Sequence, residues 1–378
     1  MVVSFCRLGD SLKAIRFIKK NLVFCIAALA ALVTCFLVPP DKAYLDYFDF
    51  KTLSCLFLTL AVVCALRNIK FFTILARRLV NLAGNLRSLF LLLIVITFIG
   101  SMIIANDMAL ITFLPLGFFA LSVTKQEKYM AYLFVLQNIS ANLGGMLTPF
   151  GNPQNLYLYS YFNIPTGEFC SIMLPSFLLA VLLLVVACIP IKPIKFSLKE
   201  EFPEKLNIKK TILYIVLFLV SILIVFRVIH FGLGLVVIPI ILFFTDRDSL
   251  KMVDYALLGT FFFFFIFAGN LSRLDAVNLL ISSLLEKDTL IVSVVSCQFI
   301  SNVPSAILLS RFTNDYAALL LGVNIGGTGT LIASLASLIT FSEFKLLHPE
   351  QTKKYLCIFT VANIIFLVIL TLAAKILI

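Results

Sequence analysis

The chain is poor in charge and contains no tryptophan. Acidic and basic residues make up only 13% of its 378 residues, and 61% of the residues are hydrophobic. A soluble domain carries about 25% charged residues and roughly 45–50% apolar ones. This lack of charge excludes an ordinary soluble domain and predicts an all-α polytopic membrane protein, because helices satisfy their own backbone groups in lipid.

Clusters of metal-binding or nucleophilic residues are also missing. The nine cysteines are scattered without a CxxC pair, and the two histidines, His230 and His348, lie at the ends of apolar segments. Structural metal sites and disulfide frameworks need clustered ligands. An intramembrane enzyme would need paired acids, a Ser/His pair or a metal. We therefore predict a protein that is not an enzyme and has no cofactor.

Lysine and arginine outnumber acids by 30 to 19, which could indicate a nucleic-acid partner. Their distribution instead follows the excess of basic residues in cytoplasmic loops of membrane proteins. With the N-terminus inside, 23 of the 30 fall in 7–20, 67–87, 125–128, 192–210, 247–251 and 345–354. We predict a multi-pass protein of the plasma (inner) membrane with a cytoplasmic N-terminus, the lipid bilayer as a partner and no nucleic acid.

Apolar runs define the membrane spans, since a transmembrane helix needs about 20 apolar residues. The first run, 22–38, is longer than the apolar region of a signal peptide, about 7–15 residues, so we expect a retained span. The predicted spans are 21–39, 51–66, 128–161 (interrupted), 171–189, 210–229, 230–244, 253–268, 315–341 (interrupted) and 355–377.

Two further apolar stretches, 86–124 and 288–312, remain. The basic residues fall on the inside as counted above only if each of these stretches returns to the side that it left. The leg from Val303 to Ser310 has about eight residues, which reach roughly 12 Å at 1.5 Å per residue. That is less than half of the hydrocarbon core, so 288–312 is predicted to be a re-entrant hairpin. By analogy 86–124 is a second one, although its longer legs leave an ordinary pair of spans open.

The two halves follow the same order of elements. The segment "ANLGGMLTPFGNPQNL" aligns with "VNIGGTGTLIASLASL", which places Asn142 on Asn324, and the tips of the hairpins align on Asn106 and Asn302. We predict an inverted repeat of about five helical elements per copy, with two re-entrant hairpins and two broken helices. The boundaries are 1–20 for the N-terminal segment, 21–189 for the first copy, 190–229 for the connector and linker helix, and 230–378 for the second copy.

Broken helices at matching positions predict a binding site at membrane mid-depth, because unwound carbonyls and helix ends can hold ions. No lysine or arginine is expected there, so an anionic substrate would be met by amides, hydroxyls and a co-bound cation. The candidate cation or coupling residues are Ser101, Asn106, Asp107, Gly144, Ser301, Asn302, Asn324 and Gly326. The candidate substrate-binding residues are Asn106, Asp107, Thr148, Gly151, Asn152, Pro153, Asn155, Ser301, Asn302, Thr328 and Thr330.

Asp107 lies between "GSMIIAN" and "MALITFLPL", far from any predicted loop. Acids at membrane depth are costly and usually functional. Its carboxylate could ligate sodium together with Asn106 and Ser101, or it could carry a proton. Alternatively it caps a helix, a role that Asp fills well. At the second tip the corresponding residue is Val303, so the two positions are chemically unequal.

These motifs resemble the ion transporter superfamily, which includes divalent anion:sodium symporters, citrate transporters and arsenite permeases. The resemblance covers about 51–344, and "LTPFGNPQN" is similar to the pattern TPxGxPxN of the family. It implies an elevator mechanism, a homodimer and sodium near Asn106 and Asn302. The tip Ala105-Asn106-Asp107 is closer to the arsenite and citrate permease branches than to the Ser-Asn-Thr of the symporters.

The function predicted from these features is cation- or proton-coupled secondary transport of a small anion, a di- or tricarboxylate such as citrate. The alternatives of the same architecture are a sodium/proton antiporter and an exporter of arsenite or another oxyanion. A passive channel is a further alternative, and single-channel recording would distinguish it from a carrier.

Overall fold

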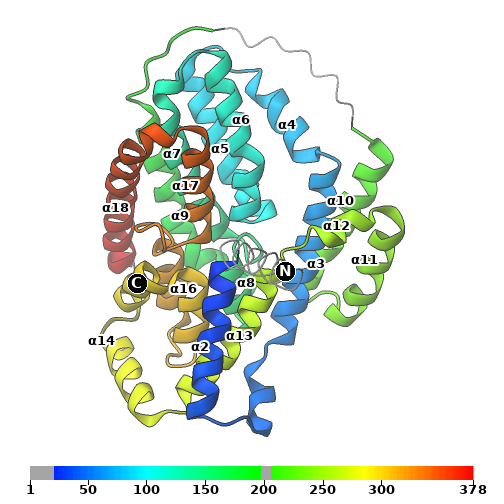
Figure 1. Cartoon of the computed structure of the whole chain (residues 1–378), viewed down its shortest axis with the longest axis vertical. Coiled ribbons are helices and arrows are strands. Elements are labelled where there is room, and N and C mark those ends of the chain that lie inside the picture. The colour runs from blue at the N-terminus through cyan, green and yellow to red at the C-terminus, as the bar shows by residue number, and fades with distance from the viewer. Residues whose placement is uncertain (1–20, 197–205, 378) are drawn as a thin grey trace, which may run out of the picture.

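The computed structural model describes residues 21–196 and 206–377, and in these ranges every regular element is a helix (Figure 1). The predicted N-terminal segment 1–20 and residues 197–205 of the connector lie outside the described residues. Seven described helices are long and apolar enough to cross a membrane. They are Phe50–Asn68, Leu86–Ile104, Asn106–Val123, Thr166–Cys188, Ile208–Val225, Arg247–Ser272 and Pro349–Leu377, where Arg247–Ser272 includes a break after Lys251 and Pro349–Leu377 begins with a 3-10 turn.

The first half of the chain ends with α9 and contains eight α-helices in the described part. Their bounds are α2 Leu22–Leu37, α3 Phe50–Asn68, α4 Phe71–Val80, α5 Leu86–Ile104, α6 Asn106–Val123, α7 Met130–Gly144, α8 Pro153–Tyr161 and α9 Thr166–Cys188. The run predicted as one interrupted span, 128–161, is thus two helices, α7 and α8, separated by residues 145–152.

The second half begins with the linker helix α10. The helices are α10 Ile208–Val225, α11 Phe231–Thr245, α12 Arg247–Lys251, α13 Tyr255–Ser272, α14 Asp275–Ile300, α15 Asn302–Leu309, α16 Tyr316–Ile325, α17 Leu335–Leu347 and α18 Thr352–Leu377. Helix α14 changes direction at Asp288, whose backbone is not helical. The predicted interrupted span 315–341 is divided between α16 and α17 by residues 326–334.

The two predicted hairpins differ in length. Helix α15 has eight residues, as expected for a short leg, and eight residues extend about 12 Å. Helices α5 and α6 have 19 and 18 residues, and each is long and apolar enough to span a membrane. The structure therefore keeps both alternatives open for 86–124, a re-entrant hairpin and an ordinary pair of spans.

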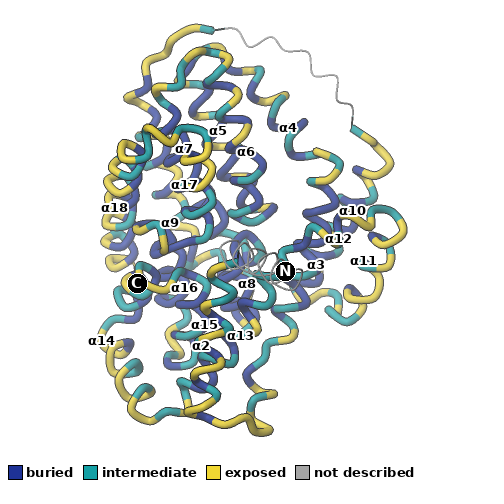
Figure 2. Tube along the Cα trace, viewed as in Figure 1, coloured by how far each residue is buried: buried dark blue, intermediate teal, exposed yellow. Residues whose placement is uncertain are grey.

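The helices form two columns in the upper part of Figure 1, with α5, α6, α7, α9, α17 and α18 at the left and α3, α10, α11 and α12 at the right. Helix α4 contacts α3 of the right column and α5 and α6 of the left, and further contacts are made where α8 packs on α3 and α15 packs on α13. Helix α7 buries every residue except Tyr132. By contrast, α10, α11 and α18 are largely teal and yellow in Figure 2 and expose apolar side chains. The central position of α7 places the segment that follows it inside the protein.

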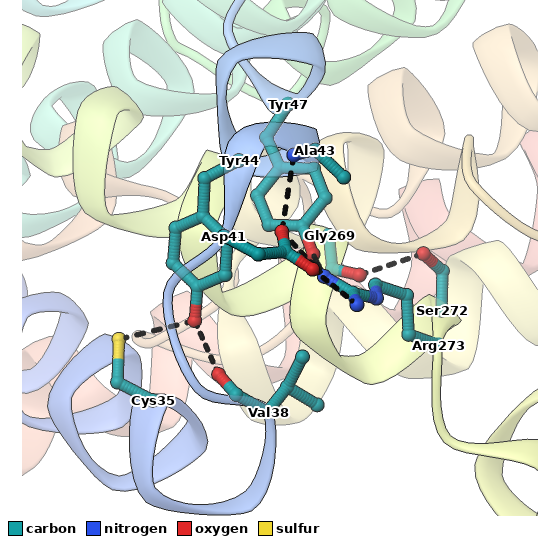
Figure 3. Close-up of polar contacts among 9 residues, drawn as sticks. All are labelled: Cys35, Val38, Asp41, Ala43, Tyr44, Tyr47, Gly269, Ser272 and Arg273. Carbon is teal, nitrogen blue, oxygen red and sulfur yellow. Dashed lines mark hydrogen bonds and ion pairs between the residues drawn. The ribbon is translucent and has the colours of Figure 1, made fainter.

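Polar contacts between loops respect the predicted sidedness. The Arg273 guanidinium pairs with Asp41 at 2.7 Å and donates to the Tyr47 hydroxyl at 3.1 Å, which joins two segments predicted to be outside (Figure 3). Hydrogen bonding to Arg273 holds the pKa of Asp41 below its ordinary value. On the predicted inside, the Asn68 amide donates to Asp246 at 2.9 Å. Each of these contacts links segments that the sequence assigns to one side.

Candidate functional site

Helices α5 and α6 meet at the first tip, residues 105–107. Ala105 has φ 69° and ψ 154°, a conformation that is strained for a residue with a side chain. The buried Asn106 begins α6: its Oδ1 accepts a hydrogen bond from the Asp107 backbone N–H at 2.9 Å, and its Nδ2 donates to Asn142 Oδ1 at 3.3 Å. The tip is thereby attached to α7 through two asparagine side chains.

The first unwound segment, residues 145–152, follows α7 directly; it leaves the α-helical path through one 3-10 turn, Gly145–Leu147. A Cβ on Gly144 would lie 2.3 Å from the Phe98 carbonyl oxygen, so only glycine allows α7 to approach α5 this closely. Pro153 occupies the first turn of α8, where its missing N–H is no loss. The Thr148 hydroxyl donates to the Met102 carbonyl at 2.8 Å, which ties the segment to the end of α5.

Asparagine side chains connect the two halves of the molecule. Asn152 Nδ2 donates to the Asn142 carbonyl and to Asn324 Oδ1, both at 3.2 Å. Asn324 Nδ2 in turn donates to Asn155 Oδ1 at 2.6 Å. The Asn155 Nδ2 group donates to the carbonyls of Gly145, Met146 and Thr148 at 3.0, 3.2 and 3.3 Å. Four of the aligned or predicted residues thus share one buried network.

The second tip, residues 301–303, repeats the backbone of the first. Ser301 has φ 75° and ψ 159°, and Asn302 Oδ1 accepts from the Val303 backbone N–H at 2.9 Å. The Asn302 backbone N–H donates to the Ala333 carbonyl at 2.9 Å, and the Ser301 hydroxyl donates to the same carbonyl at 3.3 Å. This tip is therefore held by the second unwound segment, residues 326–334.

Contacts between each tip helix and its neighbouring broken helix also recur. In the first half, the Ser101 hydroxyl donates to the Ala141 carbonyl. At the aligned positions, the Cys297 thiol lies 4.0 Å from the Val323 carbonyl oxygen. The hydrogen bond from Thr148 to Met102 is matched by one from the Thr330 hydroxyl to the Gln298 carbonyl at 3.0 Å. The same pairs of sequence positions are in contact in both halves.

Unpartnered polar atoms distinguish the two tips. Four buried atoms around the first tip have no hydrogen-bond partner: Asp107 Oδ1, Asn142 Nδ2, Asn152 Oδ1 and Gln154 Oε1. Buried polar groups are normally paired, and each exception calls for an explanation such as a bound ion or ligand. Among the described side chains of residues 297–303 and 326–334, no such atom occurs. The first tip therefore has free bonding capacity that the second lacks.

The other predicted residues are divided between these two places. Gly151 lies against Gly145 in the first segment, and the Thr328 hydroxyl donates to the Ile325 carbonyl at 2.7 Å in the second. Thr330 is exposed, and Gly326 ends α16. Within residues 21–196 and 206–377, no group of three or more His, Cys, Asp or Glu side chains could hold a metal.

Sequence reasoning left two polar residues off the candidate set, Asn142 and Gln298. Each is a carboxamide among mainly apolar or small residues, and that isolation was the available signal. Arg67 was also missed: at the end of α3, its Nη1 lies 3.6 Å from the Met108 sulfur, two residues after Asn106. A basic side chain thus reaches α6 close to the tip, although it comes from a segment predicted to be a cytoplasmic end.

Residues 13–318 match the family model described as citrate transporter, so the chain belongs to that family of membrane transporters. The resemblance drawn from the tips and from "LTPFGNPQN" is thereby confirmed. The uncharacterized transporter MJ0456 of Methanocaldococcus jannaschii is 32% identical over 335 residues, which cover 87% of this chain and 90% of that protein. The inner membrane protein YbiR of Escherichia coli is 29% identical over 342 residues, with coverage of 87% and 89%.

Proposed function

We propose that this transporter carries a small anion, a di- or tricarboxylate such as citrate, together with a cation or proton bound at the first tip. The observation that carries the proposal is the group of four unpartnered buried atoms around Asn142, which includes a carboxylate oxygen of Asp107. An ionisable group at membrane depth is costly, and such groups usually have a function. A bound sodium ion would neutralise the carboxylate and would be coordinated by the unpartnered oxygens. A proton would instead neutralise the carboxylate by binding to it covalently.

The proposed architecture is the inverted repeat, and the recurring contacts support it. Both tips place a non-glycine residue in the same strained conformation, and both are followed by an asparagine that accepts from the next backbone N–H. In transporters with inverted repeats, the broken helices of the two copies meet at the midplane site. Here Asn152 of the first copy bonds Asn324 of the second, at the place where such a site is expected.

An elevator-type movement is proposed for the left column of Figure 1 against the right. Two short hydrogen bonds to backbone carbonyls join segments predicted to be outside, whereas on the predicted inside Arg67 Nη1 of α3 lies 3.6 Å from the Met108 sulfur of α6. The Arg311 guanidinium donates to the Tyr47 carbonyl, and the Arg227 guanidinium donates to the Tyr159 carbonyl, both at 2.6 Å. Two such contacts fit a conformation that is closed at the outer side. The homodimer and the inner-membrane location with a cytoplasmic N-terminus stay predictions.

The test is gradient-driven uptake of labelled citrate and succinate into proteoliposomes, with imposed sodium or proton gradients. We expect uptake by the wild-type chain and its loss in Asp107→Asn, since the amide has no charge to neutralise and cannot take up a proton at neutral pH. The matched control is Asp315→Asn, because Asp315 caps α16 by accepting from the Ala318 N–H at 3.1 Å and Asn caps equally well. Unchanged uptake in Asp107→Asn would remove this carboxylate from the coupling mechanism.

Sodium/proton antiport is the second candidate, favoured by the fact that the bonded network around Asn142 contains a single ionisable group. One carboxylate that exchanges a proton for sodium would suffice for it. Addition of sodium to proteoliposomes with an acidic lumen would then raise the luminal pH without any carboxylate present. The same vesicles loaded with arsenite would test the oxyanion exporter.

A further inference from the structure

We infer that Gln298 occupies, with its own carboxamide, the place where a cation would bind at the second tip, so that the chain has a single coupling-ion position. This inference rests on the proposed function, because it concerns which of the two tips takes the coupling ion. It assigns to Gln298 the role of a residue that sets the ion stoichiometry.

Three backbone carbonyl oxygens surround the carboxamide of Gln298, and we call this arrangement a carbonyl cradle. Its Nε2 donates to the carbonyl of Gly326 at 2.9 Å, to that of Val294 at 3.0 Å and to that of Thr328 at 3.2 Å. Its Oε1 accepts from the Thr330 backbone N–H at 2.9 Å. Three carbonyl oxygens from two segments thus converge on one nitrogen, and the other end of the carboxamide is satisfied as well.

Such a cradle would otherwise attract a monovalent cation. Gly326 ends α16, and the carbonyls at the end of a half-helix carry partial negative charge. Unwound carbonyls and half-helix ends are the groups that coordinate sodium in transporters with inverted repeats. The –NH₂ group of glutamine offers two donors and partial positive charge. It therefore bonds the same oxygens in place of an ion, with its two N–H groups shared among the three carbonyls.

The first tip has no equivalent of this side chain. The residue aligned with Gln298 is Met102, which has no strong donor, and only its backbone carbonyl is used by Thr148. Asn155 does serve three carbonyls of the first unwound segment, but it reaches them from α8 and leaves Asp107 Oδ1 and Asn152 Oδ1 without partners. The second tip also has Val303 in place of the acid. Charge and free acceptors thus coincide at the first tip alone.

The experiment is a count of bound sodium per purified chain, with ²²Na⁺ as the probe in a potassium-free buffer. We expect at most one sodium in the wild-type chain and one more than the wild-type number in Gln298→Ala, because removal of the carboxamide frees the Gly326 and Thr328 carbonyls. The matched control is Met102→Ala, which removes a side chain of similar length at the mirror position and should leave the count unchanged.

A second variant keeps the size of the side chain. In Gln298→Glu a carboxylate would face three carbonyl oxygens, an arrangement that is costly without a cation or proton. We expect the thermal stability of this variant to rise with sodium concentration more steeply than that of the wild type. A wild-type count of two, an unchanged or lower count in Gln298→Ala, or a sodium-independent Gln298→Glu would each overturn the inference.

Failure of the inference can be told apart from failure of the proposed function. Absence of gradient-driven carboxylate uptake in the wild-type chain would contradict the function, whatever the sodium counts are. An unchanged count in Gln298→Ala, alongside wild-type uptake that needs Asp107, would contradict only the role of Gln298. Because the wild-type count is itself decisive, the inference can be refuted even if a variant does not fold.

Discussion

The two tips have almost the same backbone and very different side chains. Ala105 and Ser301 share one strained conformation, and Asn106 and Asn302 each accept from the next backbone N–H. The first tip then has an acid and unpartnered oxygens, whereas the second has Val303 and a set of satisfied hydrogen bonds. The comparison indicates that the shared backbone conformation shapes both tips, and that the side chains decide which tip has free groups for binding an ion.

The largest effect is expected where the first half is packed most tightly. In Gly144→Ala the new Cβ would meet the Phe98 carbonyl oxygen at 2.3 Å, and a backbone atom cannot move aside as a side chain can. In Gly326→Ala it would meet the Gly322 carbonyl oxygen at 2.7 Å and the Cys297 thiol at 2.9 Å. Overpacking costs about 1–3 kcal/mol, and we expect the upper end for Gly144→Ala and a smaller loss for Gly326→Ala.

The measurement is the midpoint of thermal unfolding of the purified variants in one detergent. Gly167→Ala serves as the control, since nothing lies within 4 Å of the position that its Cβ would take. A larger loss of stability for Gly326→Ala than for Gly144→Ala would contradict the greater tightness of the first half.

Substitution of the tip asparagines is expected to affect stability similarly at both tips but transport at only one. Asn106→Ala and Asn302→Ala each remove the acceptor of one backbone N–H, which costs about 1 kcal/mol. We expect similar shifts in the unfolding midpoint for the two variants. Uptake in proteoliposomes should be abolished only in Asn106→Ala, because Asn106 also bonds Asn142 beside the unpartnered atoms. Equal loss of uptake in both variants would mean that the second tip takes part in binding.

The smallest difference is expected for the matched threonines. Thr148→Val and Thr330→Val remove hydrogen bonds of 2.8 and 3.0 Å to the hairpin backbones. Thr148 is half-buried and Thr330 is exposed, so water can replace the second bond more easily. We expect a loss of about 1 kcal/mol for Thr148→Val and less for Thr330→Val, measured again as unfolding midpoints. The reverse order would show that exposure at the second tip does not weaken the bond.

Much of the fold could be predicted from local signals in the sequence. The eight-residue leg from Val303 and the pair Gly144–Pro153 fixed where helices end, because helix length and backbone freedom are local properties. The length of α5 and α6 left the first hairpin ambiguous, and it stays so in the structure. Apolar length alone cannot tell a deep hairpin from two spans.

The location of the site could be predicted from the sequence, but the hydrogen-bond partners of its side chains could not. Asn106 was identified as a candidate from the hairpin tip, and Asn152 and Asn324 from the two broken helices. Which of them is satisfied by a neighbour depends on distances between elements far apart in the chain. Gln298 illustrates the limit, since its partners Gly326 and Thr328 lie in the unwound segment 326–334. The sequence shows an isolated carboxamide at this position, but it does not show which carbonyls that carboxamide bonds.

The side chain of Asn152 has a consequence for which substitutions the buried asparagine network can accept. One carboxamide bonds both Asn142 of its own half and Asn324 of the other. Because Asn142 contributes its backbone carbonyl, any residue at that position keeps this acceptor, whereas replacement of Asn152 or Asn324 removes the bond between the halves. As far as these two bonds are concerned, position 142 therefore accepts other side chains, while positions 152 and 324 are coupled to each other.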